Sequence, residues 1–370
     1  MQNAMRGELF IGDRLQTARE FRGLTQSKLA EKVIASPAMI SLLESGAKRE
    51  PPPDLVDAIG TVLGFHPDFF YDPLDDLFKE DECSFRHRRS TPARLKGQIR
   101  AHGTLLGIVI SKLRLHMKFP ALNLPKFAAT TNEEIEVAAE RSRMHWELGL
   151  DAPILQVGRV LEHAGVIVLP HFPQTTKVDA FSRQGQTAVI FLNQGVKSTS
   201  RWIFDIGHEC GHLIMHAGME TGTPETEDAA NRYASAFLLP RRAFVREFRS
   251  MSWGHLFDLK RRWLVSVAAI VRRAYDLGLI TAVQYRRAYQ YISFKGWTKG
   301  EPYEPSFQQP ELLETAFKSL GSKVSLTTQV LCDEVHFTPE TFKQVTGVVV
   351  PPPPAARKAE VLSFPNSEGD

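Results

Sequence analysis

The residues best suited to chemistry form the pattern His-Glu-Cys-Gly-His at positions 208–212, inside a strongly helical stretch of sequence. Histidines four positions apart project from the same face of a helix, so the imidazoles of His208 and His212 can bind one zinc ion. Glu209 is turned by about 100° around the helix and can reach a water molecule at the metal. The spacing therefore predicts a catalytic zinc site in which Glu209 is the general base.

A tetrahedral catalytic zinc needs a third protein ligand. A histidine later in the same segment would require Gly at 215 and His at 218, but the chain has Met215 and Gly218 there. The next predicted helix offers three acids in its first turns, Glu225, Glu227 and Asp228. We prefer Glu227 because it shares a helical face with Asn231, whereas acids such as the other two are more often solvated at a helix N-terminus.

Two further side chains near the motif have simpler interpretations. His216 lies one more turn along the helix, beyond the reach of a metal held by the first two histidines, so we interpret it as a supporting or capping residue. Cys210 lies about 200° around the helix from His208 and is interpreted as a core residue rather than a redox group. The three cysteines, at positions 83, 210 and 332, have no CxxC spacing, which argues against a disulfide scaffold.

The segment HECGHLIMH, followed by ETEDAANRYASAFLLP, resembles the active-site helix and the glutamate helix of the ImmA/IrrE family of zinc metallopeptidases. Further similarity lies upstream at residues 178–181, 190–193 and 201, and downstream at residues 263–266, 277–280, 296–297 and 301–302. The resemblance covers about residues 130–302. It departs from the family's usual pattern at Gly207 and Cys210, which are not ligand positions.

This resemblance implies a mainly helical, zincin-like domain with a small β-sheet. It implies one Zn²⁺ per chain, bound by His208, His212 and Glu227, with Glu209 as the catalytic acid and base. It also implies a regulatory protein as the substrate.

Residues 8–78 read as short helices only. Thr25 can cap one helix, and another begins at Ser36, where the following proline fits a first helical turn because its missing N–H is harmless there. Residues 15–63 resemble the helix-turn-helix domain of Xre/Cro-type repressors, which implies binding to a double-stranded DNA operator.

In that geometry Thr25 and Gln26 open the helix that crosses the phosphate backbone. The following helix presents four side chains to the major groove, Ser36, Ala38, Met39 and Ser41, and two cations then hold phosphates, Lys48 and Arg49. Residues 1–50 carry eight basic and six acidic side chains, a weak excess for a DNA-binding domain. The remaining positive charge needed for DNA binding can come from dimerisation or from the basic segment 81–126, which has a net charge of +8. A helical bundle that binds only protein is the alternative.

The pattern of the residues after the N-terminal domain predicts an α+β fold for the second part of the chain. Residues 81–148 read as mostly helical, with Asn132 as the cap of a helix over 133–148. A helix at 154–163 precedes at least two strands, at 166–169 and 188–192, and helices then continue from about 200 to 292. We predict five segments in chain order: a helix-turn-helix domain (8–78), a basic helical connector (79–150), a zinc peptidase domain with a helical extension (151–302), a helical segment (303–346) and a flexible tail (347–370).

The longest apolar runs, such as residues 105–110, are far shorter than the roughly 18 residues that span a bilayer, and residues 1–10 lack the apolar core of a signal peptide. We therefore expect a cytoplasmic protein without a membrane partner.

Two functions fit these patterns. The first is a homodimeric DNA-binding regulator whose zinc endopeptidase cleaves a repressor, another regulatory protein or its own chain, the most exposed place for a self-cut being residues 72–90. The second is an antitoxin-like repressor that neutralises a toxin, with the zinc domain as a sensor or protein-interaction module. The complete ligand and base positions favour activity, although it can be latent. A purely structural zinc is disfavoured because structural sites usually take all four ligands from the protein.

Overall fold

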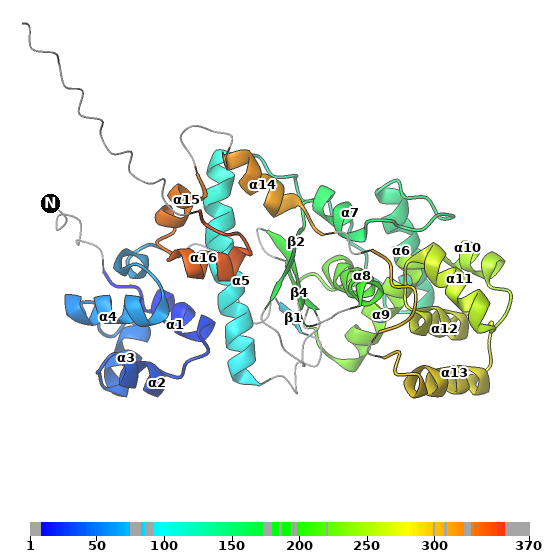
Figure 1. The fold of residues 1–370 in the computed structure, drawn as a ribbon, viewed down its shortest axis with the longest axis horizontal. Coiled ribbons are helices and arrows are strands. Elements are labelled where there is room, and N and C mark those ends of the chain that lie inside the picture. Colours follow the sequence, from blue (N-terminus) through cyan, green and yellow to red (C-terminus); the bar gives the residue numbers. More distant parts are fainter. Residues whose placement is uncertain are drawn as a thin grey trace, which may run out of the picture.

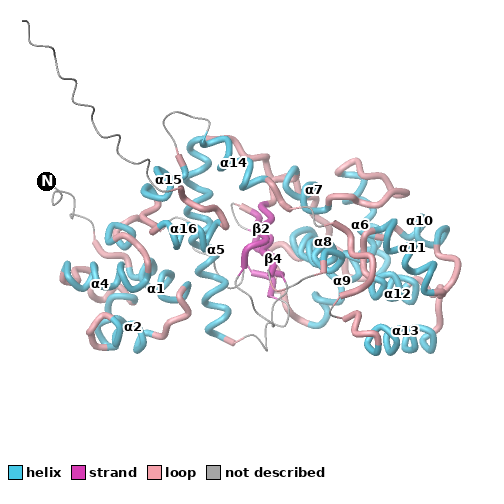
Figure 2. The backbone as a smooth tube through the Cα atoms, viewed as in Figure 1, coloured by secondary structure: helices cyan, strands magenta, loops and turns pink. Residues whose placement is uncertain are grey.

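The structure is a computed structural model that describes residues 9–351, except 75–82, 86–91, 173–179, 185, 186, 194, 196, 197, 220, 299, 307, 308 and 322–326. Helices dominate it, and the strands form one small sheet near the middle of the molecule (Figure 2). The predicted α+β class is confirmed, with an all-α N-terminal domain followed by a mainly helical part. No helix among the described residues is long and apolar enough to cross a bilayer.

The N-terminal domain contains four α-helices and one 3₁₀-helix: α1 (Gly12–Phe21), α2 (Gln26–Lys32), α3 (Pro37–Glu44), α4 (Pro53–Leu63) and η1 (Pro67–Phe70). The predicted cap at Thr25 is confirmed, and Ser36, where a helix was predicted to begin, is the cap of α3. The hydroxyl of Thr25 accepts a hydrogen bond from the Lys28 N–H, and that of Ser36 accepts one from the Met39 N–H. These caps satisfy N–H groups that the first helical turn would otherwise leave without partners.

The sheet has four strands in the order β1-β3-β4-β2, namely β1 (Cys83–Phe85), β3 (Ala180–Gln184), β4 (Ala188–Asn193) and β2 (Ile167–Phe172). β2 and β4 pair in parallel and match the two predicted strands, whereas β1–β3 and β3–β4 are antiparallel. β1 and β3 were not predicted, because they are short and lack a run of β-branched residues.

The two faces of the sheet pack against different helices, as Figure 1 shows. Val189 and Phe191 of β4 join the core formed with α5 (Ala93–His116) and the N-terminal domain. Ile190 and Leu192, which alternate with them, join the core around α8 (Thr199–Met215) and α9 (Pro224–Leu238). Burial on both faces explains why this strand is apolar from Ala188 to Leu192.

The remaining helices surround α8 and α9 or follow them in the chain. They are α6 (Asn132–His145), α7 (Val157–His163), α10 (Arg241–Glu247), α11 (Trp253–Trp263), α12 (Val267–Asp276), α13 (Ala282–Phe294), α14 (Leu312–Gly321), α15 (Thr328–Glu334) and α16 (Pro339–Thr346).

The structure corrects three sequence predictions between residues 81 and 163. Residues 117–130 contain no helix, because Pro120 and Pro125 cannot continue one. The cap of α6 is Thr131 rather than Asn132, and its hydroxyl accepts from the Glu134 N–H in a capping box. α7 begins at Val157, three residues later than predicted.

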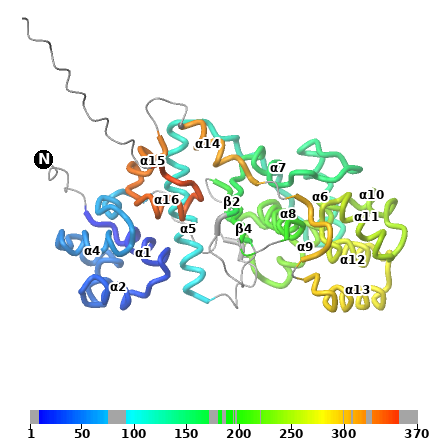
Figure 3. Tube along the Cα trace, viewed as in Figure 1, coloured from blue at the N-terminus to red at the C-terminus, as the bar shows by residue number. Residues whose placement is uncertain are grey.

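Helices distant in sequence pack together around the N-terminal domain (Figure 3). Arg100 of α5 forms an ion pair with Glu20 of α1, with a shortest N–O distance of 2.6 Å. Arg22 donates to the hydroxyl of Thr341 in α16 at 2.5 Å. One core thus contains residues from all five predicted segments: 8–78, 79–150, 151–302, 303–346 and the first residues of 347–370. Most of the predicted tail, residues 352–370, and part of the basic segment lie outside the described residues.

Candidate metal centre and DNA-reading face

Helix α8 carries the His-Glu-Cys-Gly-His pattern in its second half. It begins after Ser198, whose hydroxyl accepts a hydrogen bond from the Arg201 N–H. His208, Glu209 and His212 are all buried. The polar side chains thus face an interior site formed between α8, α9 and the sheet.

A buried ionic cluster holds the beginning of α8. Glu304 accepts hydrogen bonds from the N–H and the hydroxyl of Ser200, and the ammonium group of Lys260 lies 2.6 Å from Glu304 and 2.8 Å from Glu301. Burial raises the pKa of Glu304, but the bonds from Lys260 and Ser200 outweigh it and leave the pKa below its usual range. The cluster connects α8 to α11. The fully buried Lys260 of α11 forms ion pairs with Glu301 and Glu304, and Glu304 also binds Ser200 of α8.

Three ligand atoms converge between α8 and α9. The Nε2 atoms of His208 and His212 lie 3.1 Å apart, and each is 3.4 Å from one carboxylate oxygen of Glu227. Two ligands that are about 2.0–2.1 Å from a tetrahedral zinc lie roughly 3.3 Å from each other. Each of the three separations is close to this value, and among the described residues these side chains form a group that could hold a metal ion.

The environment of Glu227 also fits a cation. Among the described residues, neither of its buried carboxylate oxygens has a hydrogen-bond partner. Burial opposes ionisation, but the two facing histidines outweigh it and hold the pKa of Glu227 below its usual range. A bound metal ion would give both buried carboxylate oxygens a cationic partner. Glu225 and Asp228 are exposed and stay outside the cluster.

Each histidine ligand is oriented by a second side chain through its other ring nitrogen. Nδ1 of His208 lies 3.0 Å from Oδ1 of Asn231, and Nδ1 of His212 lies 3.0 Å from Nδ1 of His216. Donation from Nδ1 leaves Nε2 as the free lone pair of each ligand. Burial and the neighbouring His212 lower the pKa of His216 to about 4, so His216 is neutral and can accept this bond.

The side chain of Glu209 points toward the sheet rather than toward Asn231 and His216, the residues that contact the histidines through Nδ1. The hydroxyl of Ser182, in β3, donates to its Oε2 at 2.6 Å. This bond fixes one carboxylate oxygen of a buried acid that directly follows His208 in α8. Ser182 was not predicted, because nothing in the short strand marks it as part of a site.

Close contact between α8 and α9 brings Glu227 to the histidines. A Cβ at Gly211 would lie 3.0 Å from the ring of Tyr233, closer than ordinary side-chain contacts allow. Cys210 lies next to the same tyrosine, and burial raises the pKa of its thiol to about 12. The thiol is therefore protonated and packed in the core, as the sequence suggested.

On the N-terminal domain, α3 presents its predicted DNA-contacting side chains to different extents. Ser36, Ala38 and Ser41 are exposed, while Met39 is half-buried against the core. The Ser36 hydroxyl is also engaged as the helix cap. Three of the four positions thus remain open on one short helix.

The other predicted DNA contacts surround this helix. Thr25 is exposed and caps α2, whereas the amide of Gln26 donates to Glu44 at 2.7 Å, and Glu44 also pairs with Arg19. Lys48 is half-buried and Arg49 exposed just after α3. Gln26 is therefore held in place by the body of the domain.

Comparison with protein families identifies two regions of the chain. Residues 11–68 match the family model of a helix-turn-helix domain. Residues 161–275 match the model of the IrrE N-terminal-like domain, Peptidase M78. No curated protein matches the chain. The second match contains all the residues that meet at the candidate metal centre.

Proposed function

We propose that this chain, a helix-turn-helix domain joined to an IrrE-like peptidase-type domain, is a DNA-binding regulator and a zinc-dependent endopeptidase. Its substrate would be a repressor or another regulatory protein of the cytoplasm. The observation that carries this proposal is the convergence of His208, His212 and Glu227, together with the buried Glu209 that follows His208 in α8.

The roles of the side chains follow from their contacts. His208, His212 and Glu227 would hold one zinc ion, which when bound supplies a Lewis acid that polarises a peptide carbonyl and acidifies a water molecule. Glu209 would take the proton from the attacking water and pass it to the departing amine. Ser182 would keep the Glu209 carboxylate in position, while Asn231 and His216 would fix the tautomers of the two histidines.

The N-terminal domain would read DNA by placing α3 in the major groove, with Thr25, Gln26, Lys48 and Arg49 toward the phosphates. A domain of this kind reads only a few base pairs. We therefore propose a homodimer on an inverted repeat, whose half-sites are about one helical turn apart.

Peptide hydrolysis by the zinc-loaded full chain is the test, with the Glu209→Gln variant as the matched control. A proteome-derived peptide mixture is incubated with each protein and new termini are mapped by mass spectrometry. We expect cleavage by the wild type and a loss of at least 100-fold in the variant at equal zinc content, because an amide cannot accept the proton.

If the zinc-loaded wild type cleaves neither this mixture nor repressors encoded near its gene, the antitoxin-like alternative replaces the endopeptidase. If Glu209→Gln cleaves at the wild-type rate, Glu209 is not the base.

A further inference from the structure

The first turns of α5 lie against the loop that joins α1 to α2. Nε of Arg94 and the amide nitrogen of Gln98 lie 3.0 and 2.7 Å from where a Cβ of Gly23 would stand. Gly23 also has a left-handed φ of 61°, which favours glycine at this position. Further along α5, the ion pair between Arg100 and Glu20 holds the helix to α1. The guanidinium of Arg94 is thus held close to the backbone of this loop.

This contact places Arg94 beside the start of the helix that would cross the DNA backbone. Gly23 comes two residues before Thr25, the cap of α2, and two residues of an extended chain span at most about 7 Å. Phosphates recur about every 3.4 Å of axis along each DNA strand, so a strand that passes Thr25 carries other phosphates within this distance. In Figure 1, α2, α3 and the first turns of α5 lie along the same edge of the molecule. Arg94 therefore extends the DNA-reading face.

Arg94 differs from the other arginines around this loop, each of which has a polar partner within the protein: Arg19 with Glu44, Arg22 with Thr341, and Arg100 with Glu20. The side chain of Arg94 is exposed, and no carboxylate of the described residues lies within ion-pair distance of it. The first turn of α5 also contains no acidic residue. The positive charge of Arg94 is therefore not neutralised by the described part of the fold and can be offered to an anion.

The DNA-reading face has few charges of its own. The exposed positions on and just before α3 are all uncharged: Ser36, Pro37, Ala38, Ser41 and Leu42. Residues 1–50 have eight basic side chains against six acidic ones. Affinity for DNA that does not depend on sequence comes from phosphates neutralised by lysine and arginine. A phosphate contact from α5 would increase this affinity and leave the reading of bases to α3.

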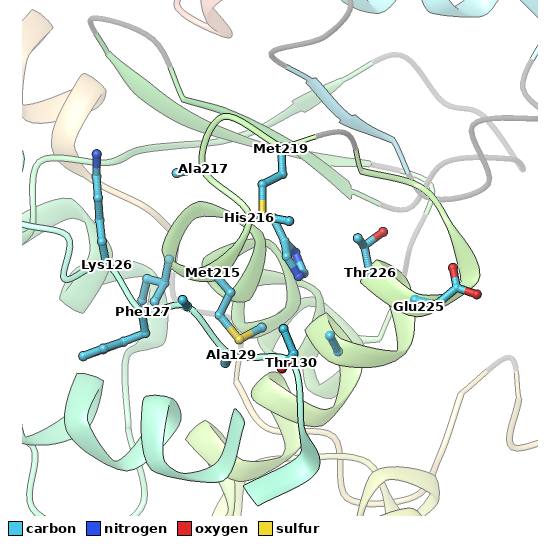
Figure 4. Close-up of a pocket in the computed structure, with 13 residues that line it drawn as sticks. Lys126, Phe127, Ala129, Thr130, Met215, His216, Ala217, Met219, Glu225 and Thr226 are labelled. Carbon is cyan, nitrogen blue, oxygen red and sulfur yellow. The ribbon is translucent and has the colours of Figure 1, made fainter. Parts of the chain in front are cut away.

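We propose that Arg94 binds a DNA phosphate beside the start of α2, so that the first turn of α5 belongs to the DNA interface although it lies outside the helix-turn-helix match at 11–68. This inference rests on the proposed DNA binding, and it assigns that role to one end of the basic segment 81–126. Arg114 lies about 30 Å further along the same helix. Lys126 lies beside a pocket at the end of α8, in the part of the chain that holds the metal centre (Figure 4).

Binding of the full chain to a mixed-sequence DNA duplex of about 30 base pairs, long enough for two half-sites, tests this contact. Fluorescence anisotropy gives the association constant at about 50–200 mM salt. Each neutralised phosphate contributes about −0.9 to the slope of log K against log[salt], so Arg94→Ala should make the slope shallower by about 0.9 per bound protomer. The same exponent makes one contact worth about eightfold at 100 mM relative to 1 M salt, and we expect that loss of affinity per protomer. Arg94→Lys should keep most of the slope because it keeps the charge.

Arg114→Ala and Lys126→Ala are the matched controls, because each removes one exposed positive charge from the same basic segment. Both should bind the duplex like the wild type, since a charge about 30 Å away is screened beyond a Debye length of about 8–10 Å. Thermal unfolding and zinc content should be unchanged in all of these variants, because the substituted side chains are exposed.

Two results would overturn the proposal while DNA binding stands. The first is an Arg94→Ala variant with the wild-type slope and affinity. The second is an equal loss in either control, because the effect would then follow from net charge alone. A wild-type chain that does not bind the duplex at any of these salt concentrations would refute the proposed DNA binding itself, and the phosphate contact with it.

Discussion

The metal centre and the DNA-reading face both depend on helices capped by Ser or Thr, but they differ in where their residues come from. The centre gathers buried side chains from α8, α9 and β3, so its ligand distances are set by contacts within the chain. The DNA-reading face consists of exposed side chains on and around α3, within 25 residues of sequence. The candidate metal centre is thus enclosed by the fold, whereas the predicted DNA contacts lie mostly at the surface.

The largest effect is expected when one of the three candidate metal ligands is removed. His208→Ala, His212→Ala and Glu227→Ala should each abolish stoichiometric zinc binding, because each supplies one of three protein ligands. Metal analysis of the purified protein measures this, and Glu225→Ala, an exposed acid two residues away, is the matched control. Full zinc content in a His208→Ala, His212→Ala double variant would rule out this metal centre.

A smaller loss is expected when the supporting contacts are removed. Asn231→Ala and His216→Ala should each weaken zinc binding by about 10- to 100-fold, because the imidazole tautomer and orientation are no longer fixed. Competition with a chelator of known affinity gives the dissociation constants. Wild-type affinity in both variants would mean that packing alone orients the histidines.

Helix packing in the centre can be tested with two glycines of α8. Gly211→Ala should destabilise the protein by about 1–3 kcal/mol and weaken zinc binding, because the new methyl group meets the Tyr233 ring. Gly207→Ala meets its neighbours at 3.4 Å or more and should be nearly neutral. Denaturant unfolding with and without zinc compares the two, and equal effects would contradict the close α8–α9 contact as the cause.

The smallest effects are expected on the DNA-reading face. Gln26→Ala should weaken binding to all sequences alike, because it would act on the phosphate backbone, whereas Met39→Ala should change the sequence preference. Binding is measured at about 50 and 200 mM salt, and the wild-type affinity should fall with salt. Salt-independent binding would contradict a phosphate-dominated interface and favour the protein-binding bundle.

Local patterns were predictable from the sequence and distant packing was not. The cap at Thr25, the start of a helix at Ser36 and the strands β2 and β4 follow from neighbouring residues, and helical spacing suggested Glu227, whose carboxylate lies 3.4 Å from His208 in the structure. Ser182 could not be found, because its contact with Glu209 depends on how β3 crosses α8. The prediction that 81–148 is mostly helical was wrong at 117–130, because Pro120 and Pro125 cannot continue a helix.

The core shared by the N-terminal domain, α5 and α16 changes what a break in the chain would do. The stretch 72–90, predicted as the place for a self-cut, lies mostly outside the described residues. Whatever its structure, the domain is also held by Glu20–Arg100, by Arg22–Thr341 and by the packed rings of Phe65 and Phe337. A nick there would alter the covalent connectivity without separating the pieces. The two fragments should elute as one particle under native conditions and resolve only after denaturation.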